Sequence, residues 1–139
     1  MDPDIIRNKL ESLIRCVHRI ESKRPDSLKS LQADIDRQDI IVLNLERAVQ
    51  TCVDIGAHVL ADYDVSAPVS MAEVFRTLAE KEIVADELAE RLARAVGFRN
   101  IAVHQYQSIN WEIVYAIITV HLDDFRLFSG DIDRLLTRN

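Results

Sequence analysis

Apolar side chains recur every three or four residues over most of this chain, and that spacing limits the fold more than any other feature. It is the pattern of one buried face of an α-helix, which turns once in about 3.6 residues. The chain also has only three glycines and three prolines among 139 residues, few for the turns that a sheet protein of this size needs. We therefore predict an all-α fold, an up-and-down bundle of four to five helices that forms one domain over residues 1–139. The three clearest apolar faces are Ile6, Leu10, Leu13, Val17 and Ile20; Val42, Leu45, Val49, Cys52, Gly56, Val59 and Tyr63; and Val114, Ile118, His121, Phe125, Phe128, Ile132 and Leu135.

Capping residues and prolines mark the ends of the first helices. Asp2 followed by Pro3 is typical of a helix start, because a proline in the first turn needs no hydrogen-bond partner for its nitrogen. Pro25 disfavours helical geometry in the residue before it, so the first helix ends there. The pattern leaves two alternatives for residues 27–62. They form either one long helix, or a short helix followed by a long one, with the weakest point at DIDRQD, residues 34–39.

The second half of the chain has a clear loop at residues 62–70, DYDVSAPVS. Ser70 followed by Glu73 is a capping box, in which the two residues cap the start of a helix reciprocally. We therefore expect a short helix over about residues 70–80. A longer helix starts near residues 84–86, and a last helix starts near Ser108.

The charge and cysteine content exclude several classes of protein. The net charge is −6, from 17 lysines and arginines against 23 aspartates and glutamates. This balance argues against broad, non-specific binding to nucleic acid, although it permits a small local basic site. The two cysteines make neither a disulfide framework nor a zinc pattern, and Cys52 lies on an apolar face, where packing is expected. Residues 1–20 are too charged for a signal peptide, and no apolar run reaches the ~18 residues of a membrane span. We expect a cytoplasmic protein with no membrane partner.

The stretch RNIAVHQY, residues 99–106, places several polar side chains where the helical pattern predicts a core. Leu88, Leu92 and Ala95 form the apolar line of the preceding helix, and Arg99 is the next position on that line. At 100° per residue, the arginine lies within about 40° of all three apolar residues. The sequence therefore predicts a guanidinium group on the buried line of this helix.

A guanidinium group on a buried line costs several kcal/mol unless an anion or a strong acceptor faces it. One interpretation is structural, with Arg99 paired to a carboxylate such as Asp54 or Glu112. The other is a phosphate-binding site, because the planar fork of arginine can hold two phosphate oxygens at once. The pattern alone leaves both open.

His104 raises a geometric difficulty. On an unbroken helix it lies about 140° around from Arg99 and only about 40° from Asn100, its neighbour one turn earlier. Asn100 is therefore placed to orient the imidazole, while Arg99 faces another way. Either the helix ends between Arg99 and His104, or two chains complete one site, and the second alternative predicts a dimer.

The other polar candidates have plainer interpretations. His121 lies on an apolar face, where a core or interface histidine is favoured. His18 and His58 lack ligand-type neighbours at a repeating spacing, so we expect no metal site. Asp123 and Asp124 are expected to be solvated. The sequence contains no glycine-rich phosphate loop and no motif of a serine hydrolase or a zinc protease, and we expect no cofactor.

The motif resembles that of the HEPN domains, and specifically of the HepT-like toxins encoded beside a minimal nucleotidyltransferase antitoxin. In that superfamily four to six residues separate an arginine, commonly followed by a polar residue, from a histidine, and RNIAVH, residues 99–104, has four between them. HepT-like members add a tyrosine two residues after the histidine, which matches Tyr106. The segments ERAVQTCVDIGAHVL and VFRTLAEKEIVADELAERLARAVGFRNIAVHQYQSINWEIVYAII also resemble successive family segments. The resemblance covers most of the chain.

The resemblance implies a homodimer in which two motifs face each other and cut RNA without a metal ion. His104 would transfer the proton at the scissile phosphate, Arg99 would stabilise the developing charge, and Asn100 would orient or hydrogen bond. The products would be a 2′,3′-cyclic phosphate and a 5′-hydroxyl. Arg91 and Arg94 would support the RNA groove, and no DNA partner is expected.

The resemblance also implies that the antitoxin transfers AMP onto Tyr106, whose added charge and bulk would block RNA. From spacing alone, Tyr106 is better interpreted as a packing residue on the apolar line of its helix. Two alternatives to the toxin also stay open. One is a module that binds a nucleotide or phosphate without catalysis, and the other is a purely structural helical dimer.

Overall fold

The chain folds entirely into helices and turns. A computed structural model describes residues 1–138, and no strand occurs in this range. The prediction of an all-α bundle is confirmed, with four helices of 16 or more residues and three shorter ones. The elements are α1 (Pro3–Lys23), α2 (Leu28–Ala33), α3 (Ile35–Leu60), α4 (Met71–Glu80), α5 (Asp86–His104), the 3-10 turn η1 (Tyr106–Ser108), α6 (Trp111–Ala116), the π turn η2 (Ile117–His121) and α7 (Asp123–Arg138).

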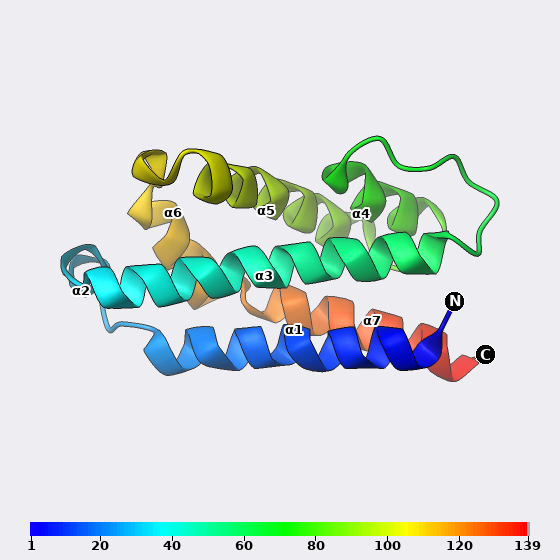
Figure 1. Ribbon diagram of the computed structural model, residues 1–139, viewed down its shortest axis with the longest axis horizontal. Helices are drawn as coiled ribbons and strands as arrows, with labels where there is room; N and C mark the ends of the chain where they lie inside the picture. The colour runs from blue at the N-terminus through cyan, green and yellow to red at the C-terminus, as the bar shows by residue number, and fades with distance from the viewer. Residues whose placement is uncertain (139) are drawn as a thin grey trace.

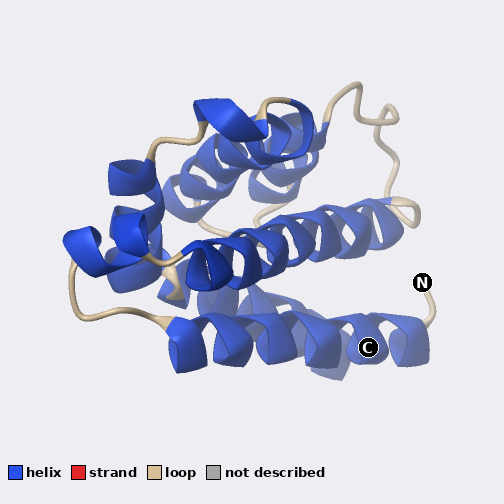
Figure 2. Cartoon of the chain, turned by 60° about the vertical axis from the view of Figure 1, so that its left-hand side comes forward, coloured by secondary structure: helices blue, strands red, loops and turns tan. Residues whose placement is uncertain are grey.

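The four long helices alternate in direction along the bundle (Figure 1). Helix α3 packs against α1 on one side and against α5 on the other, and α7 lies against α1, α3 and α5. The turned view in Figure 2 shows the same order, with α3 between α1 and α5. The two chain ends meet at one end of the bundle, while the C-terminal end of α5 and helices α2 and α6 lie at the other (Figure 1). This second end carries the RNIAVHQY stretch.

Side-chain caps fix the starts of the first four helices. The Asp2 carboxylate accepts hydrogen bonds from the backbone nitrogens of Asp4 and Ile5, and Pro3 opens α1. Ser27 caps α2, and Asp34 accepts from the backbone nitrogen of Arg37 at 3.1 Å to start α3. Of the two alternatives for residues 27–62, the structure therefore shows the second, a short helix followed by a long one. The Ser70 half of the predicted capping box is confirmed, since Ser70 Oγ accepts from the backbone nitrogen of Glu73 at 3.2 Å.

The last helix differs from its prediction. It begins at Trp111 under an Asn110 cap and is interrupted by η2. A π turn holds an additional residue because its hydrogen bonds span five residues instead of four. Leu122, four residues after Ile118 and three before Phe125, occupies the core position, and His121 is exposed. The expectation of a core histidine at His121 is wrong because Leu122 takes that place, while an interface histidine stays a prediction.

Backbone carbonyl oxygens at this wider turn accept hydrogen bonds from side chains. Arg24 Nη1 donates to the carbonyl oxygen of Ile118 at 3.0 Å, and Thr119 Oγ1 donates to that of Tyr115 at 2.7 Å. Buried backbone oxygens without a partner are costly, so these contacts stabilise η2. The π turn is thus held by Arg24, which directly follows α1, as well as by its own helix.

The interior is formed by apolar side chains from all of the long helices. Both cysteines are buried, and burial raises the pKa of the Cys52 thiol well above its ordinary value, so its predicted packing role is confirmed. No helix within residues 1–138 combines the length and apolar character needed to cross a membrane.

Gly56 allows α3 and α4 to approach closely. A Cβ atom at this position would lie 2.5 Å from Val74 Cγ1 and 3.0 Å from Leu78 Cδ1, closer than side-chain carbons normally approach. Gly97, in α5, is exposed, and a Cβ atom there would meet nothing within 4 Å. Gly56 and Gly97 therefore have opposite roles.

We expect Gly56→Ala to lower the free energy of unfolding by about 1–2 kcal/mol, because overpacking outweighs the gain in helix propensity. Gly97→Ala is the matched control and should raise it by about 0.5–1 kcal/mol. Urea unfolding at one fixed protein concentration measures both values. Equal stability of Gly56→Ala and the unchanged protein would contradict the close approach of α3 and α4.

Candidate active site

Helix α5 carries Arg99, Asn100 and His104, and it remains helical through His104. It ends at Gln105, whose backbone angles of φ −142° and ψ 54° leave the helical region. The helix therefore does not end between Arg99 and His104. The two side chains leave α5 in directions about 140° apart.

Arg99 is half-buried, as its position on the apolar line predicts. The side chains that surround it come from α3, α5, η2 and α7. Its Nε atom is inaccessible to solvent and has no hydrogen-bond partner within residues 1–138. Nη1 donates to Asn100 Oδ1 at 3.1 Å. The small cavity at Arg99 is lined by Leu45, Glu46, Val49, Ala95, Phe98, Ile117 and Phe125.

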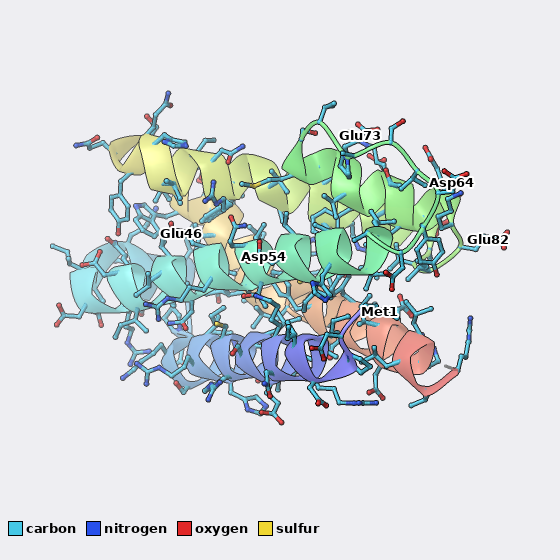
Figure 3. The ribbon with its side chains drawn as sticks, turned by 45° about the vertical axis from the view of Figure 1, so that its right-hand side comes forward. Met1, Glu46, Asp54, Asp64, Glu73 and Glu82 are labelled. Carbon is cyan, nitrogen blue, oxygen red and sulfur yellow. The ribbon has the colours of Figure 1, made fainter. Side chains whose placement is uncertain are left out.

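The structural interpretation of Arg99 required a carboxylate partner, and the proposed partners are engaged or exposed elsewhere. Asp54, on α3 (Figure 3), accepts from Gln50 Nε2 at 2.9 Å. Glu112 is exposed on α6. Among the residues that the structure describes, none forms an ion pair with Arg99. A buried donor without a partner costs about 1–3 kcal/mol, which is tolerated where a ligand supplies the acceptor.

His104 is exposed at the C-terminal end of α5. Asn100 forms its hydrogen bond with Arg99, and no such bond links it to His104 in the described part of the chain. Two neighbouring apolar side chains, Ile101 and Val103, are 42% and 41% exposed. The histidine therefore lies in a surface that is partly apolar.

Tyr106 lies in η1, just after the end of α5, and is 40% exposed. Its hydroxyl group donates to Asp39 Oδ1 at 2.6 Å, and its ring meets the Trp111 ring edge-on at a centroid distance of 6.4 Å. Burial, the hydrogen bond to Asp39 and the negative charges of Asp39 and Glu46 together raise the pKa of Tyr106 to about 12. The interpretation of Tyr106 as a packing residue on the α5 line is wrong, because the helix has already ended.

Sequence reasoning missed both contacts of Tyr106. Asp39 lies 67 positions away, in the stretch where the helical pattern between residues 27 and 62 is weakest. Trp111, the one tryptophan of the chain, follows the motif by a few residues. A lone tryptophan near a motif tyrosine was a usable signal, whereas nothing in the local pattern pointed to Asp39.

The two arginines expected to support the groove differ. Arg91 Nε donates to both oxygens of Asp124, at 3.0 and 3.1 Å, and His121 Nδ1 lies 3.6 Å from the same carboxylate. Asp124 is only 13% exposed, so the expectation that it is solvated is wrong, while Asp123 is exposed as expected. Arg94 is exposed and forms no ion pair with residues 1–138. Both arginines border a pocket of about 280 Å³ between α5 and the α6–η2–α7 segment.

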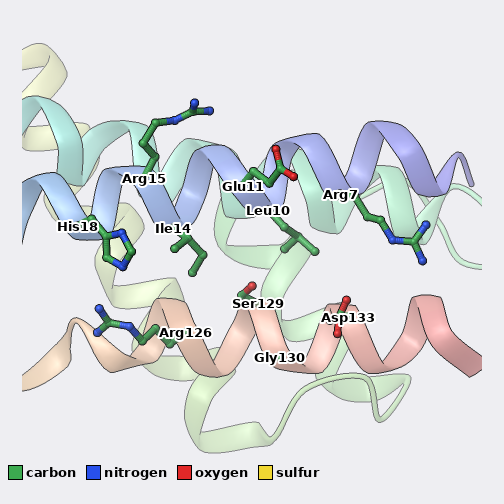
Figure 4. Close-up of a pocket in the computed structure, with 10 residues that line it drawn as sticks. All are labelled: Arg7, Leu10, Glu11, Ile14, Arg15, His18, Arg126, Ser129, Gly130 and Asp133. Carbon is green, nitrogen blue, oxygen red and sulfur yellow. The ribbon is translucent and has the colours of Figure 1, made fainter.

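A wider groove of about 760 Å³ runs between α1 and α7 (Figure 4), away from the motif. Arg126 on its wall is already engaged by Glu21 and Asp123. Within residues 1–138, no three histidine, cysteine, aspartate or glutamate side chains are grouped so that they could hold a metal ion. The unpartnered donor and the polar groups of the motif are gathered at the end of α5 instead.

Comparison with known proteins assigns the chain to a family. The model of the ribonuclease HepT-like family matches residues 6–132. The mRNA nuclease HepT of Shewanella oneidensis is 38% identical over 125 residues, which cover 90% of this chain and 93% of that protein. The tRNA nuclease HepT of Aphanizomenon flos-aquae is 27% identical over 136 residues, covering 98% and 92%.

A solved structure agrees with these relatives. The tri-AMPylated HEPN toxin of Shewanella oneidensis, in complex with its MNT antitoxin, superposes with a TM-score of 0.89 at 36% identity. The match covers 96% of this chain and 99% of that toxin. The resemblance drawn from the motif is confirmed, and this chain belongs to the ribonuclease HepT-like family.

Proposed function

We propose that this chain is the ribonuclease toxin of a toxin–antitoxin system and cuts RNA without a metal ion, at a cleft completed by a second copy of the chain. The observation that carries the proposal is the guanidinium group of Arg99, which has a buried Nε without a partner and no carboxylate within ion-pair distance in the described chain. A phosphate of RNA is an anion that fits such a group, because the planar fork binds two oxygens.

The residues of the motif suit cleavage by the neighbouring 2′-hydroxyl of RNA. His104 can accept a proton from that hydroxyl or donate one to the leaving oxygen, because imidazole titrates near neutral pH. Arg99 stabilises the negative charge that develops on the phosphorus centre. Asn100 hydrogen bonds Nη1 of Arg99 and thereby restricts the plane of the guanidinium group. These roles need no metal ion.

A second copy of the chain supplies what one helix cannot. Arg99 and His104 lie on one unbroken helix and point in different directions, so one copy does not bring both to a single phosphate. The exposed Ile101 and Val103 beside His104, together with Ile113 on α6, which is 54% exposed, give this end of the bundle an apolar surface suited to self-association. We therefore place the active site between two copies.

Neutralisation proceeds through the nucleotidyltransferase antitoxin, by AMP transfer to Tyr106, by complex formation, or by both. The Shewanella relative is AMPylated and bound to an MNT antitoxin. Tyr106 follows His104 by two residues and is partly exposed. An AMP group there adds negative charge and bulk beside the RNA site, which opposes RNA binding. The curated relatives are named for mRNA and tRNA, so the family spans more than one RNA class.

We expect His104→Ala to reduce cleavage of total cellular RNA by about 10²- to 10⁴-fold in excess EDTA, because proton transfer is lost. His18→Ala, an exposed histidine on α1, is the matched control and should cleave normally. The ends of the fragments identify the chemistry, since 2′,3′-cyclic phosphates are expected. Cleavage that disappears in EDTA would refute the metal-free mechanism, and equal cleavage by both variants would refute the role of His104 in proton transfer.

Arg99→Met should separate a functional arginine from a structural one. Removing a buried donor that has no partner should leave the free energy of unfolding unchanged or raise it by about 1 kcal/mol. Cleavage should nevertheless fall by at least about 10²-fold, and Arg99→Lys should recover only part of it, because an ammonium group lacks the fork. Denaturant unfolding and RNA cleavage are measured on the same samples, with Arg7→Ala as the control. A large loss of stability in Arg99→Met would favour the structural interpretation.

A further inference from the structure

We infer that Asp39 is the proton acceptor for AMP transfer to Tyr106, so that the toxin itself supplies the general base of the reaction that inactivates it. This inference rests on the proposed modification of Tyr106. It assigns a chemical role to a carboxylate from α3, a helix that the sequence motif does not include.

The contact has the geometry that proton transfer requires. The Tyr106 hydroxyl donates to Asp39 Oδ1 at 2.6 Å, within the range for hydrogen bonds from a hydroxyl group to an ionised oxygen. The edge-on contact with Trp111 holds the phenol ring from another side. The hydroxyl oxygen is therefore both oriented and within reach of a base.

The Asp39 carboxylate is free to accept a proton. It forms no ion pair with a lysine or arginine of residues 1–138, and it is exposed. The nearby Arg37 is engaged by Asp34 and by the carbonyl oxygen of Lys23. No cation in the described chain therefore competes with Tyr106 for this carboxylate.

The phenol needs such an acceptor because it is a weak acid in this position. With a pKa of about 12, roughly one molecule in 10⁵ carries an ionised Tyr106 at neutral pH. The hydroxyl must then lose its proton during the attack and not before it. Protein kinases solve the same problem with an aspartate that accepts the proton of the substrate hydroxyl.

The transfer of AMP to Tyr106 needs no reactant other than ATP. The Tyr106 hydroxyl oxygen attacks the α-phosphorus of ATP, and the bond from that oxygen to phosphorus forms. The bond between the α-phosphorus and the bridging oxygen of the β-phosphate breaks, and pyrophosphate leaves. The phenolic proton passes to Asp39 and from there to solvent.

The same geometry separates the product, Tyr106 carrying AMP, from its base, Asp39. After transfer the Tyr106 oxygen has no proton to donate, so its hydrogen bond to Asp39 is lost. The new phosphodiester carries a negative charge beside Asp39 and Glu46, the two carboxylates whose charges already act on Tyr106. Like charges repel, which turns the AMP group away from α3.

The test measures AMP transfer to this chain, residues 1–139, from radiolabelled ATP, using a minimal nucleotidyltransferase antitoxin at a saturating concentration. The variants are Asp39→Asn, Asp39→Glu and, as a matched control one turn earlier on α3, Asp36→Asn. Tyr106→Phe identifies the modified residue. We expect Asp39→Asn to slow the transfer by at least about 10²-fold at saturation, Asp39→Glu to recover part of the rate, and Asp36→Asn to behave as the unchanged protein.

Two further readouts distinguish a base from a structural contact. The residual rate of Asp39→Asn should rise with pH, because the phenol must then ionise first, while the unchanged protein responds little near neutral pH. Ultraviolet titration, with Tyr106→Phe as the reference, should show a lower pKa for Tyr106 in Asp39→Asn, since one of the causes that raise it is removed.

The inference is overturned if Asp39→Asn is modified at the unchanged rate, or if its defect disappears at saturating antitoxin, which would make Asp39 a docking residue. An unaltered Tyr106 pKa in this variant would also overturn it, because the hydrogen bond would then be absent. If the unchanged toxin takes up no AMP at all, the proposed modification fails together with this inference. Modification of Tyr106 that does not depend on Asp39 leaves the proposed function intact and removes the inference alone.

Discussion

Helix α3 is the element on which the rest of the structure depends, because it packs against α1, α2, α4, α5 and α7. A helix with neighbours on so many sides must present small or apolar side chains in several directions. It does so with a fully buried Ala48 and Cys52 and with Gly56 at the contact with α4. Asp39 and Glu46, two turns apart on the same face of α3, are left beside the motif end of α5. The helix that organises the core thus also supplies the carboxylates around the candidate site.

At Arg99, the apolar packing that the core favours conflicts with the charged group that the candidate site needs. The apolar line of α5 continues from Leu92 to Ala95 and then reaches a guanidinium group whose Nε is cut off from water. An apolar residue there would suit the fold better, since it would leave no buried donor without a partner. Functional sites are the places where such local conflicts are retained. Arg91, only two turns earlier on the same helix, has no such conflict because Asp124 satisfies it.

Much of the fold could be predicted from the sequence because it depends on local rules. The apolar spacing identified the long helices, and Asp2, Pro3 and Ser70 marked helix starts through interactions within a few residues. The half-burial of Arg99 followed from the same periodicity. The hydrogen bond between Tyr106 and Asp39 joins residues 67 positions apart, and the ion pair between Arg91 and Asp124 joins residues 33 positions apart. No local pattern encodes such contacts, since they depend on how the helices pack.

The π turn could not be predicted from the sequence for a different reason. An apolar residue every three or four positions fits His121 and Leu122 almost equally well, so the sequence does not reveal which of them faces the core. The hydrogen bond from Arg24 to the carbonyl oxygen of Ile118 connects this choice to α1, which no analysis of the last helix alone would include.

The π turn also sets how many residues the chain can hold between the motif and α7. A π turn absorbs its additional residue locally, so the helical segments before and after it keep nearly the directions they have in an unbroken helix. Loss of one residue from Ile117–His121 would therefore let the turn return to α-helical geometry and leave α6 facing the same way, with Trp111 still beside the Tyr106 ring. Relatives that keep the tyrosine–tryptophan contact can therefore lack one residue in this segment and have a regular helix in its place.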